Sequence, residues 1–217
     1  MFKFLTTLSF LLIGLSFCLT KSEKMLREKR QANKLHITLL YESLCPDSRN
    51  FMHQLGPVYE ELHQFLNIDL VPFGKSESRV DQNSNEITFR CQHGPPECQG
   101  NRLQSCVLNS TNNQAAKVKF VICQMLALDY SSVDQCAREA NILTDVDDCV
   151  NSETGNKLQL QAELVTKLYQ PTFIPTIVYN GVFNAQLQEH SLRNFRATVC
   201  YMLRQLNLLA ADESVCQ

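Results

Sequence analysis

The cysteine content of the chain constrains its fold more than any other feature, because ten cysteines fall within 217 residues. The N-terminus decides how these thiols behave. An apolar run from Leu5 to Phe17 follows the positive residue Lys3, which is the pattern of a secretory signal peptide. The run is shorter than the roughly 20 apolar residues of a membrane span, and no later stretch is long enough to span a bilayer either. We therefore predict a signal peptide over 1–20 and an oxidising compartment, in which thiols pair as disulfides.

Removal of Cys18 with the signal peptide leaves nine cysteines, so pairing into four disulfides leaves one thiol over. Cys45 is the candidate for this unpaired thiol, because 46 residues separate it from Cys91, where the other cysteines begin. The expected structural disulfide cysteines are Cys91, Cys98, Cys106, Cys123, Cys136, Cys149, Cys200 and Cys216. Their pairing stays open, as does the alternative in which Cys45 is bridged and another cysteine is unpaired.

A second processing signal follows the signal peptide. The basic run Arg27–Arg30 has the spacing cut by furin-type proprotein convertases, which predicts a propeptide over 21–30 and a single domain over 31–217. The alternative is a solvated charged segment. Six of the 20 basic residues and two of the 22 acidic residues lie in the first 30, so the rest of the chain has a net charge of −6. We therefore expect no nucleic-acid partner, since such a partner requires a basic surface.

Two further features concern modification and metals. The sequon Asn109-Ser110-Thr111 predicts N-glycosylation at Asn109. The sequence contains no Cys-x-x-Cys pair, and its cysteines and histidine between 91 and 106 lack the paired ligand spacing of zinc ribbons and fingers. We accordingly expect no metal and no bound cofactor.

A strand–helix–strand unit is predicted at the start of the domain. Leu35–Tyr41 is apolar and contains β-formers, which indicates a buried strand, and Ile68–Phe73 is the second strand. Pro46 suits the first position of a helix, which places Cys45 at the N-cap. The apolar residues that continue this helix recur at helical spacing: Phe51, Leu55, Val58, Leu62 and Phe65.

Residues 74–155 differ in character and are predicted to form a disulfide-braced helical insertion. The first part, 74–111, is polar and rich in turn residues. A hairpin with its turn at Asn180-Gly181 is expected near the C-terminus, with Val182-Phe183 starting the return strand. The other expected helices are 114–130, 132–141, 144–150, 158–169 and a last one through 192–206.

The predicted helix start gives Cys45 a chemical role. Unpaired backbone N–H groups and the positive end of the helix dipole favour a thiolate over a thiol, although Asp47 in the first turn opposes this effect. Ile174-Pro175 lies after a helix and directly before the predicted hairpin. This order resembles that of thioredoxin-like proteins, in which a cis-proline lies against the active cysteine. We therefore expect Pro175 to be cis and to take part in substrate docking.

The segment from Cys91 to Cys106 reads CQHGPPECQGNRLQSC and resembles a family signature. It matches CQHGx2ECx2Nx4C of the gamma-interferon-inducible lysosomal thiol reductase (GILT) family, and the resemblance extends over roughly 35–205. The fixed positions are Cys91, Gln92, His93, Gly94, Glu97, Cys98, Asn101 and Cys106. The resemblance implies an α/β, thioredoxin-like fold and a secreted or lysosomal thiol–disulfide oxidoreductase that reduces disulfides of protein substrates.

The chain departs from the family at its active site. The family carries Cys-x-x-Cys, whereas this chain has Cys45-Pro46-Asp47-Ser48. The resemblance implies that Cys45 is the nucleophile. Ser48 cannot attack the mixed disulfide that Cys45 forms, since a hydroxyl is too weakly ionised and too weakly attracted to sulfur. We expect an external thiol, such as cysteine or glutathione, to complete the cycle, and the Ser48 hydroxyl to donate a hydrogen bond to the thiolate.

A second class of function stays open at this point. The chain could be a catalytically impaired GILT-like glycoprotein that binds or covalently traps a partner, or that forms a disulfide-linked dimer through Cys45. A saposin-like lipid binder is a third interpretation, based on the cysteine-rich helical segment. That interpretation leaves the strand–helix–strand unit and the hairpin unexplained.

Overall fold

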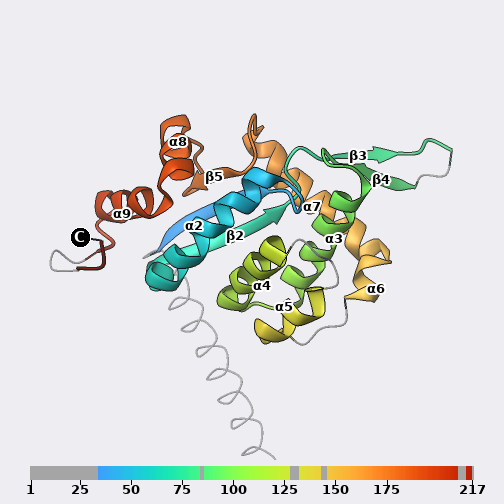
Figure 1. Cartoon of the computed structure of the whole chain (residues 1–217). Coiled ribbons are helices and arrows are strands. Elements are labelled where there is room, and N and C mark those ends of the chain that lie inside the picture. Colours follow the sequence, from blue (N-terminus) through green and yellow to red (C-terminus); the bar gives the residue numbers. More distant parts are fainter. Residues whose placement is uncertain (1–33, 84–85, 128–131, 143–145, 210–213, 217) are drawn as a thin grey trace, which may run out of the picture. The chain divides into compact units, whose positions relative to one another are not determined.

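A three-stranded sheet with the strand order β2–β1–β5 forms the centre of the fold (Figure 1). The computed structural model describes residues 34–83, 86–127, 132–142, 146–209 and 214–216. The predicted signal peptide and propeptide lie outside these residues. β1 (Leu35–Tyr41) runs parallel to β2 (Leu66–Pro72) and antiparallel to β5 (Thr176–Tyr179).

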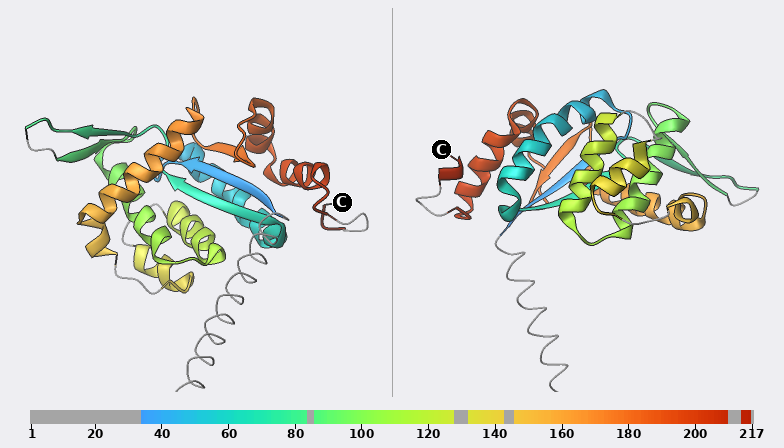
Figure 2. Two further views of the ribbon diagram at one scale, coloured as in Figure 1. Left: turned by 180° about the vertical axis from the view of Figure 1, so that it is seen from behind. Right: turned by 60° about the horizontal axis from the view of Figure 1, so that its bottom comes forward.

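The strand–helix–strand unit is confirmed. The helix α2 (Pro46–Leu62) and the short 3-10 helix η1 (His63–Phe65) connect β1 to β2. β1 is almost entirely apolar because both faces of the sheet are covered. Alternate β1 residues pack with the α2 side chains, whereas Leu40 packs with Ala162 of α7 (Glu153–Tyr169). The two helices therefore lie on opposite faces of the sheet (Figures 1 and 2).

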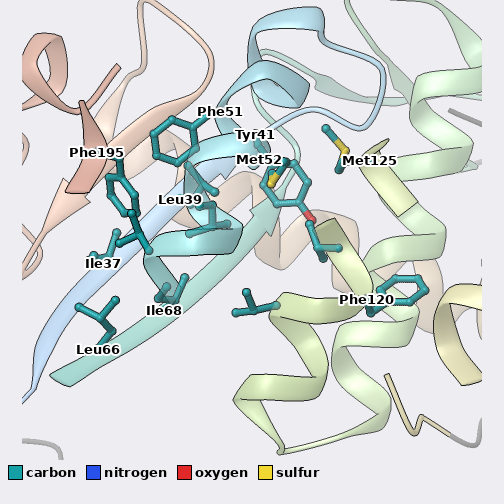
Figure 3. Packing of buried hydrophobic residues seen from close by; sticks show 14 of the residues in the cluster. Ile37, Leu39, Tyr41, Phe51, Met52, Leu66, Ile68, Phe120, Met125 and Phe195 are labelled. Atoms are coloured by element: carbon teal, nitrogen blue, oxygen red, sulfur yellow. The ribbon is translucent and has the colours of Figure 1, made fainter. Parts of the chain in front are cut away.

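The main core lies between the sheet and α2. Ile37 and Leu39 of β1 point toward α2, and the rings of Phe51 and Phe195 meet edge to face with centroids 4.9 Å apart (Figure 3). Phe195 begins α9 (Phe195–Gln205), so this contact ties the C-terminal helices to the strand–helix–strand unit. Full burial of each such side chain contributes roughly 1.5–3 kcal/mol.

The insertion is helical, but its first part is more ordered than its polar sequence predicts. Residues 74–111 contain the hairpin β3 (Glu77–Val80) and β4 (Ile87–Arg90) and the long helix α3 (Pro95–Ser110). The sequence analysis did not predict α3, because several of the residues that it buries are polar and interrupt an apolar stripe. The buried polar side chains of α3 are Glu97, Asn101, Gln104 and Ser105. The remaining helices are α4 (Gln114–Ala127), α5 (Val133–Glu139) and α6 (Asp147–Val150).

The C-terminal part corrects two further predictions. The turn at Asn180-Gly181 is present with both residues at positive φ, but the return strand is a single bridge between Tyr179 and Val182. The strand ends because Asn184 caps α8 (Ala185–Arg193), accepting a hydrogen bond from Leu187 N–H. The expected last helix is two helices, since Asn194 ends α8 and caps α9.

The eight expected cysteines form four disulfides in the described structure. They pair as Cys91–Cys98, Cys106–Cys149, Cys123–Cys136 and Cys200–Cys216. The first three lie within the predicted insertion, and the fourth joins α9 to the 3-10 helix η3 (Ser214–Cys216). Small helices such as α5 and α6 bury little apolar surface, so the bridges fix what packing alone would hold weakly.

Loss of the Cys106–Cys149 bridge is expected to lower the free energy of unfolding more than loss of the Cys123–Cys136 bridge. This bridge closes a separation of 43 residues, whereas Cys123–Cys136 closes 13. Loop-closure entropy then predicts that paired alanine substitutions lower the free energy of unfolding by about 4 and about 3 kcal/mol, respectively. Denaturant titration of both double variants measures the difference. A larger loss for the shorter loop would contradict the entropic account.

A histidine–carboxylate pair on the two parallel strands makes folding stability depend on pH. His36 Nε2 lies 2.8 Å from Asp69 Oδ2. The hydrogen bond to Asp69 raises the pKa of His36 above 6.5, outweighing the opposite effect of its partial burial. The stabilisation is therefore complete below about pH 6.5 and is lost as the pH rises through the raised pKa.

Asp69→Asn should accordingly destabilise the fold only at acidic pH. Both side chains are partly exposed, so we expect a loss below about 1 kcal/mol near pH 5.5 and none near pH 9. Denaturant unfolding at the two pH values tests this expectation. Equal losses at both would show that the ion pair is not the source of the stabilisation.

Candidate active site

Cys45 lies at the junction between β1 and α2. Residues 42–45, called here the Cys45 loop, leave the end of β1, and Cys45 is the N-cap of α2 with an extended backbone. Its Sγ accepts a hydrogen bond from the backbone N–H of Ser48 at 3.5 Å. Pro46 has no N–H to offer, so Ser48 provides the amide that faces the sulfur. The position is the one predicted from Pro46, and the sulfur faces the first turn of α2.

The thiol is the free cysteine of the described residues, and it is shielded. Cys45 is 6% exposed. The apolar residues that pack around it come from the side of the sheet that faces α7: Leu40, Val71, Phe73, Ala162 and Ile174. The polar neighbour of the sulfur is the Ser48 amide at the start of α2. The sulfur therefore has a protected position with one polar side.

The proline segment closes the other side of the thiol. The Ile174–Pro175 bond is cis, as expected, and the Cys45 thiol donates a weak hydrogen bond to the Ile174 carbonyl oxygen at 3.7 Å. β5 begins directly afterwards and pairs with β1, which fixes the segment against the Cys45 loop. Phe173, on the outer side of the segment, is 41% exposed. Residues separated by 129 positions thus meet at one sulfur atom.

The structure places Ser48 beside the sulfur but corrects the role expected for its hydroxyl. Ser48 is fully buried, and its Oγ accepts a hydrogen bond from Glu42 N–H at 3.3 Å. The contact to Cys45 Sγ comes from the Ser48 amide instead. The hydroxyl turns back toward the Cys45 loop because that loop has an amide to satisfy. Ser48 thus links both ends of the loop.

Polar residues of α3 hold the Cys45 loop in place. Asn101 Oδ1 accepts a hydrogen bond from Ser43 N–H at 2.8 Å, and the Glu97 carbonyl oxygen accepts one from the Ser43 hydroxyl at 3.0 Å. The Glu97 carboxylate lies 2.6 Å from His93 Nδ1. All four of these residues belong to the loop or to the segment between Cys91 and Cys106. That segment therefore holds in place the residues that lead to Cys45.

Glu42 is the functional residue that sequence reasoning missed. Its side chain is fully buried, and its Oε1 accepts a hydrogen bond from Lys75 N–H at 2.7 Å. Burial raises the pKa of the Glu42 carboxyl, and the nearby Glu97 charge raises it further, whereas the Lys75 amide lowers it. Gly74 has a φ of +57°, and a Cβ there would lie 2.3 Å from Glu42 Cγ. The sequence shows Glu42 only as an acid directly after a predicted strand, which gives no signal of its burial.

Comparison with known proteins identifies the family. A sequence model described as gamma interferon inducible lysosomal thiol reductase (GILT) matches residues 36–140. A protein of that name from Carassius auratus is 33% identical over 183 residues, which cover 81% of this chain and 71% of the relative. A GILT-like protein from Anopheles gambiae is 33% identical over 187 residues, covering 77% and 76%. The chain belongs to the GILT family.

GILT membership places the chain among thiol–disulfide oxidoreductases and gives its signature residues a structural meaning. The signature supplies two structural disulfide partners, Cys91 and Cys98, on either side of His93 and Glu97. It also supplies Asn101, which holds the loop through Ser43. The signature thus lies next to the Cys45 loop although 46 residues separate Cys45 from Cys91.

Solved structures show that this GILT chain has a thioredoxin-like fold. Reduced DsbA from Mycobacterium tuberculosis aligns with a TM-score of 0.52 at 18% identity, over 84% of this chain and 85% of that one. The disulfide bond oxidoreductase DsbG from the same organism gives 0.52 at 17% identity, over 83% and 81%. Among the described residues, no helix combines the length and apolar character that crossing a membrane requires.

Proposed function

We propose that the protein reduces or exchanges disulfides of protein substrates through Cys45 alone, with an external thiol as the resolving agent. The observation that supports this proposal most strongly is the pairing of a free thiol at a helix N-cap with a hydroxyl at the position three residues later. The remaining eight cysteines between 46 and 217 are in disulfides. The described fold therefore offers Cys45 no second thiol.

The proposed cycle uses two molecules of external thiol. The Cys45 thiolate attacks one sulfur of a substrate disulfide, forms a mixed disulfide and releases the other substrate sulfur as a thiolate. A first external thiolate attacks the Cys45 sulfur and releases the substrate as a dithiol. A second then attacks the external sulfur of the resulting mixed disulfide and frees Cys45. In total, one substrate disulfide and two thiols become one dithiol and one external disulfide.

The cis-proline segment supports a role in substrate docking. Pro175 lies next to the Ile174 carbonyl that contacts Cys45 Sγ, and the adjacent Phe173 is partly exposed. An exposed aromatic ring next to Ile174 in the chain suits an apolar segment of an unfolded protein better than a small polar disulfide. We propose disulfide-containing proteins as the substrate class, with Cys45 and Pro175 as the groups that meet the substrate.

The name of one relative indicates the compartment in which that relative works. The name of the Carassius auratus relative describes a lysosomal protein. We propose that this chain likewise enters the secretory pathway and is secreted or lysosomal. Asn109 is exposed near the end of α3, which is compatible with the proposed glycosylation there.

Dependence of turnover on external thiol tests the proposal. We expect reduction of a denatured disulfide protein to accelerate in proportion to glutathione at low concentrations, above the uncatalysed rate. Reactions without the protein provide that background. Turnover that is independent of glutathione at limiting concentrations would refute the single-cysteine cycle.

Non-reducing mass spectrometry separates this cycle from the second candidate, a non-catalytic covalent partner. The 6% exposure of Cys45 argues against a Cys45–Cys45 dimer, because two such sulfurs cannot meet without movement of both loops. A monomer with an alkylatable Cys45 is the expected result. A stable dimer linked through Cys45 would favour the non-catalytic role.

A further inference from the structure

Two buried carboxylates and an imidazole converge behind the Cys45 loop. Glu42 Oε2, Glu97 Oε2 and His93 Nδ1 all lie within 4.8 Å of one another. The nitrogen is 3.6 Å from the Glu42 oxygen and 2.6 Å from the Glu97 oxygen. Both glutamate side chains are fully buried, whereas the His93 side chain is 32% exposed. The group therefore presents three atoms that can bind a metal ion, and of the three side chains only His93 is exposed to solvent.

The two carboxylates are oriented in the same way. Glu42 uses Oε1 to accept Lys75 N–H at 2.7 Å, and Glu97 uses Oε1 to accept His93 N–H at 3.0 Å. Each side chain is therefore held by a backbone amide through one oxygen and directs the other toward His93. Fixed ligands with satisfied outer contacts are typical of metal sites.

One oxygen of the group is buried without a hydrogen-bond donor. Within the described residues, Glu42 Oε2 accepts no hydrogen bond, although its side chain is fully buried and faces His93. A buried acceptor that receives no hydrogen bond destabilises the fold, and more so where the group is charged. Two nearby buried carboxylates also repel one another. A divalent cation would satisfy the oxygen and neutralise both charges.

We propose that Glu42, His93 and Glu97 bind one divalent transition-metal cation, for which Zn²⁺ is the best match. Two carboxylate oxygens and one imidazole nitrogen are zinc ligands, and three protein ligands leave a fourth position open toward the exposed side of His93. Ca²⁺ and Mg²⁺ fit less well because they prefer sets of six or more oxygen ligands or several waters. The proposal departs from the sequence-based expectation of no metal, which weighed His93 together with the neighbouring cysteines and did not consider Glu42 or Glu97 as ligands.

Binding at this site would also fix the Cys45 loop. The Glu42 carbonyl oxygen accepts Cys45 N–H at 3.3 Å, and Glu42 N–H donates to Ser48 Oγ. A cation on the Glu42 side chain therefore restrains the residue to which both ends of the active-site turn are bonded.

Calorimetric titration of Zn²⁺ tests the proposal in protein that carries Cys45→Ala. This background removes the free thiol as a zinc ligand and makes the result independent of the proposed redox function. We expect one Zn²⁺ per chain and a thermal midpoint that rises with Zn²⁺ concentration.

Three added substitutions locate the site. His93→Asn and Glu42→Gln should each weaken Zn²⁺ binding at least about tenfold. His36→Asn removes a histidine–carboxylate pair outside the proposed site, the one with Asp69, and should leave the affinity unchanged. Circular dichroism identifies the variants that fold. Because His93 is partly exposed and Glu42 is fully buried, His93→Asn should disturb the fold less than Glu42→Gln. Absence of one-to-one binding, or equal affinity in folded His93→Asn, would overturn the proposal.

Discussion

Replacement of Cys45 by alanine is expected to reduce disulfide exchange to the uncatalysed rate. The eight cysteines of 46–217 are in disulfides, so no other described thiol can take over the first attack. Loss of a nucleophile also removes the mixed disulfide itself, which no amount of external thiol can restore. Reduction of a denatured disulfide protein in the presence of glutathione measures the loss.

A matched pair of substitutions separates this effect from a loss of folding. Cys123→Ala with Cys136→Ala removes two cysteines of the insertion, and Cys123 and Cys136 are not among the residues packed around Cys45. We expect this variant to be less stable than the parent but to retain exchange activity below its unfolding transition. If Cys45→Ala kept the parent rate, the assignment of the nucleophile would be wrong.

Ser48→Cys should raise multi-turnover reduction by about tenfold or more at low glutathione. The Ser48 amide already lies 3.5 Å from Cys45 Sγ, so the new sulfur would lie in the same first turn of α2. A resolving thiol held beside the mixed disulfide attacks it without a bimolecular encounter, and well-oriented intramolecular reactions gain orders of magnitude. Steady-state turnover against glutathione concentration shows the gain.

Ser48→Ala is the control for this gain. It removes the hydroxyl that accepts Glu42 N–H but adds no thiol, so turnover should not rise. The loop amide loses a buried partner, which should cost about 1–3 kcal/mol of folding stability. A gain in Ser48→Ala equal to that in Ser48→Cys would show that loosening of the loop, and not a second thiol, raises turnover.

Local rules predicted the parts of the site that lie in regular elements. Pro46 marked the start of α2 and so placed Cys45 at its N-cap, and Pro175 was placed by the order of elements around it. Nine cysteines remain after the predicted removal of Cys18, and this odd number indicated one free thiol, which the structure shows at Cys45. These features depend on residues within a few positions of one another or on simple counting.

Local sequence rules did not predict the tertiary contacts of the site. Glu42 looked like an ordinary polar residue after a strand, because only the fold brings Lys75, His93 and Glu97 around it. The direction of the Ser48 hydroxyl likewise depended on an unsatisfied amide six residues earlier in the loop. Helix α3 was missed for a related reason, since its buried face is polar and is satisfied by hydrogen bonds across the core.

The lifetime of the mixed disulfide tests the central claim most directly. Intact mass spectrometry after mixing the protein with a denatured disulfide substrate should show one adduct, and peptide mapping should place it on Cys45. The adduct should persist without external thiol and decay at a rate proportional to added glutathione. Rapid decay without any added thiol, or an adduct on another cysteine, would contradict the claim that one cysteine carries the chemistry.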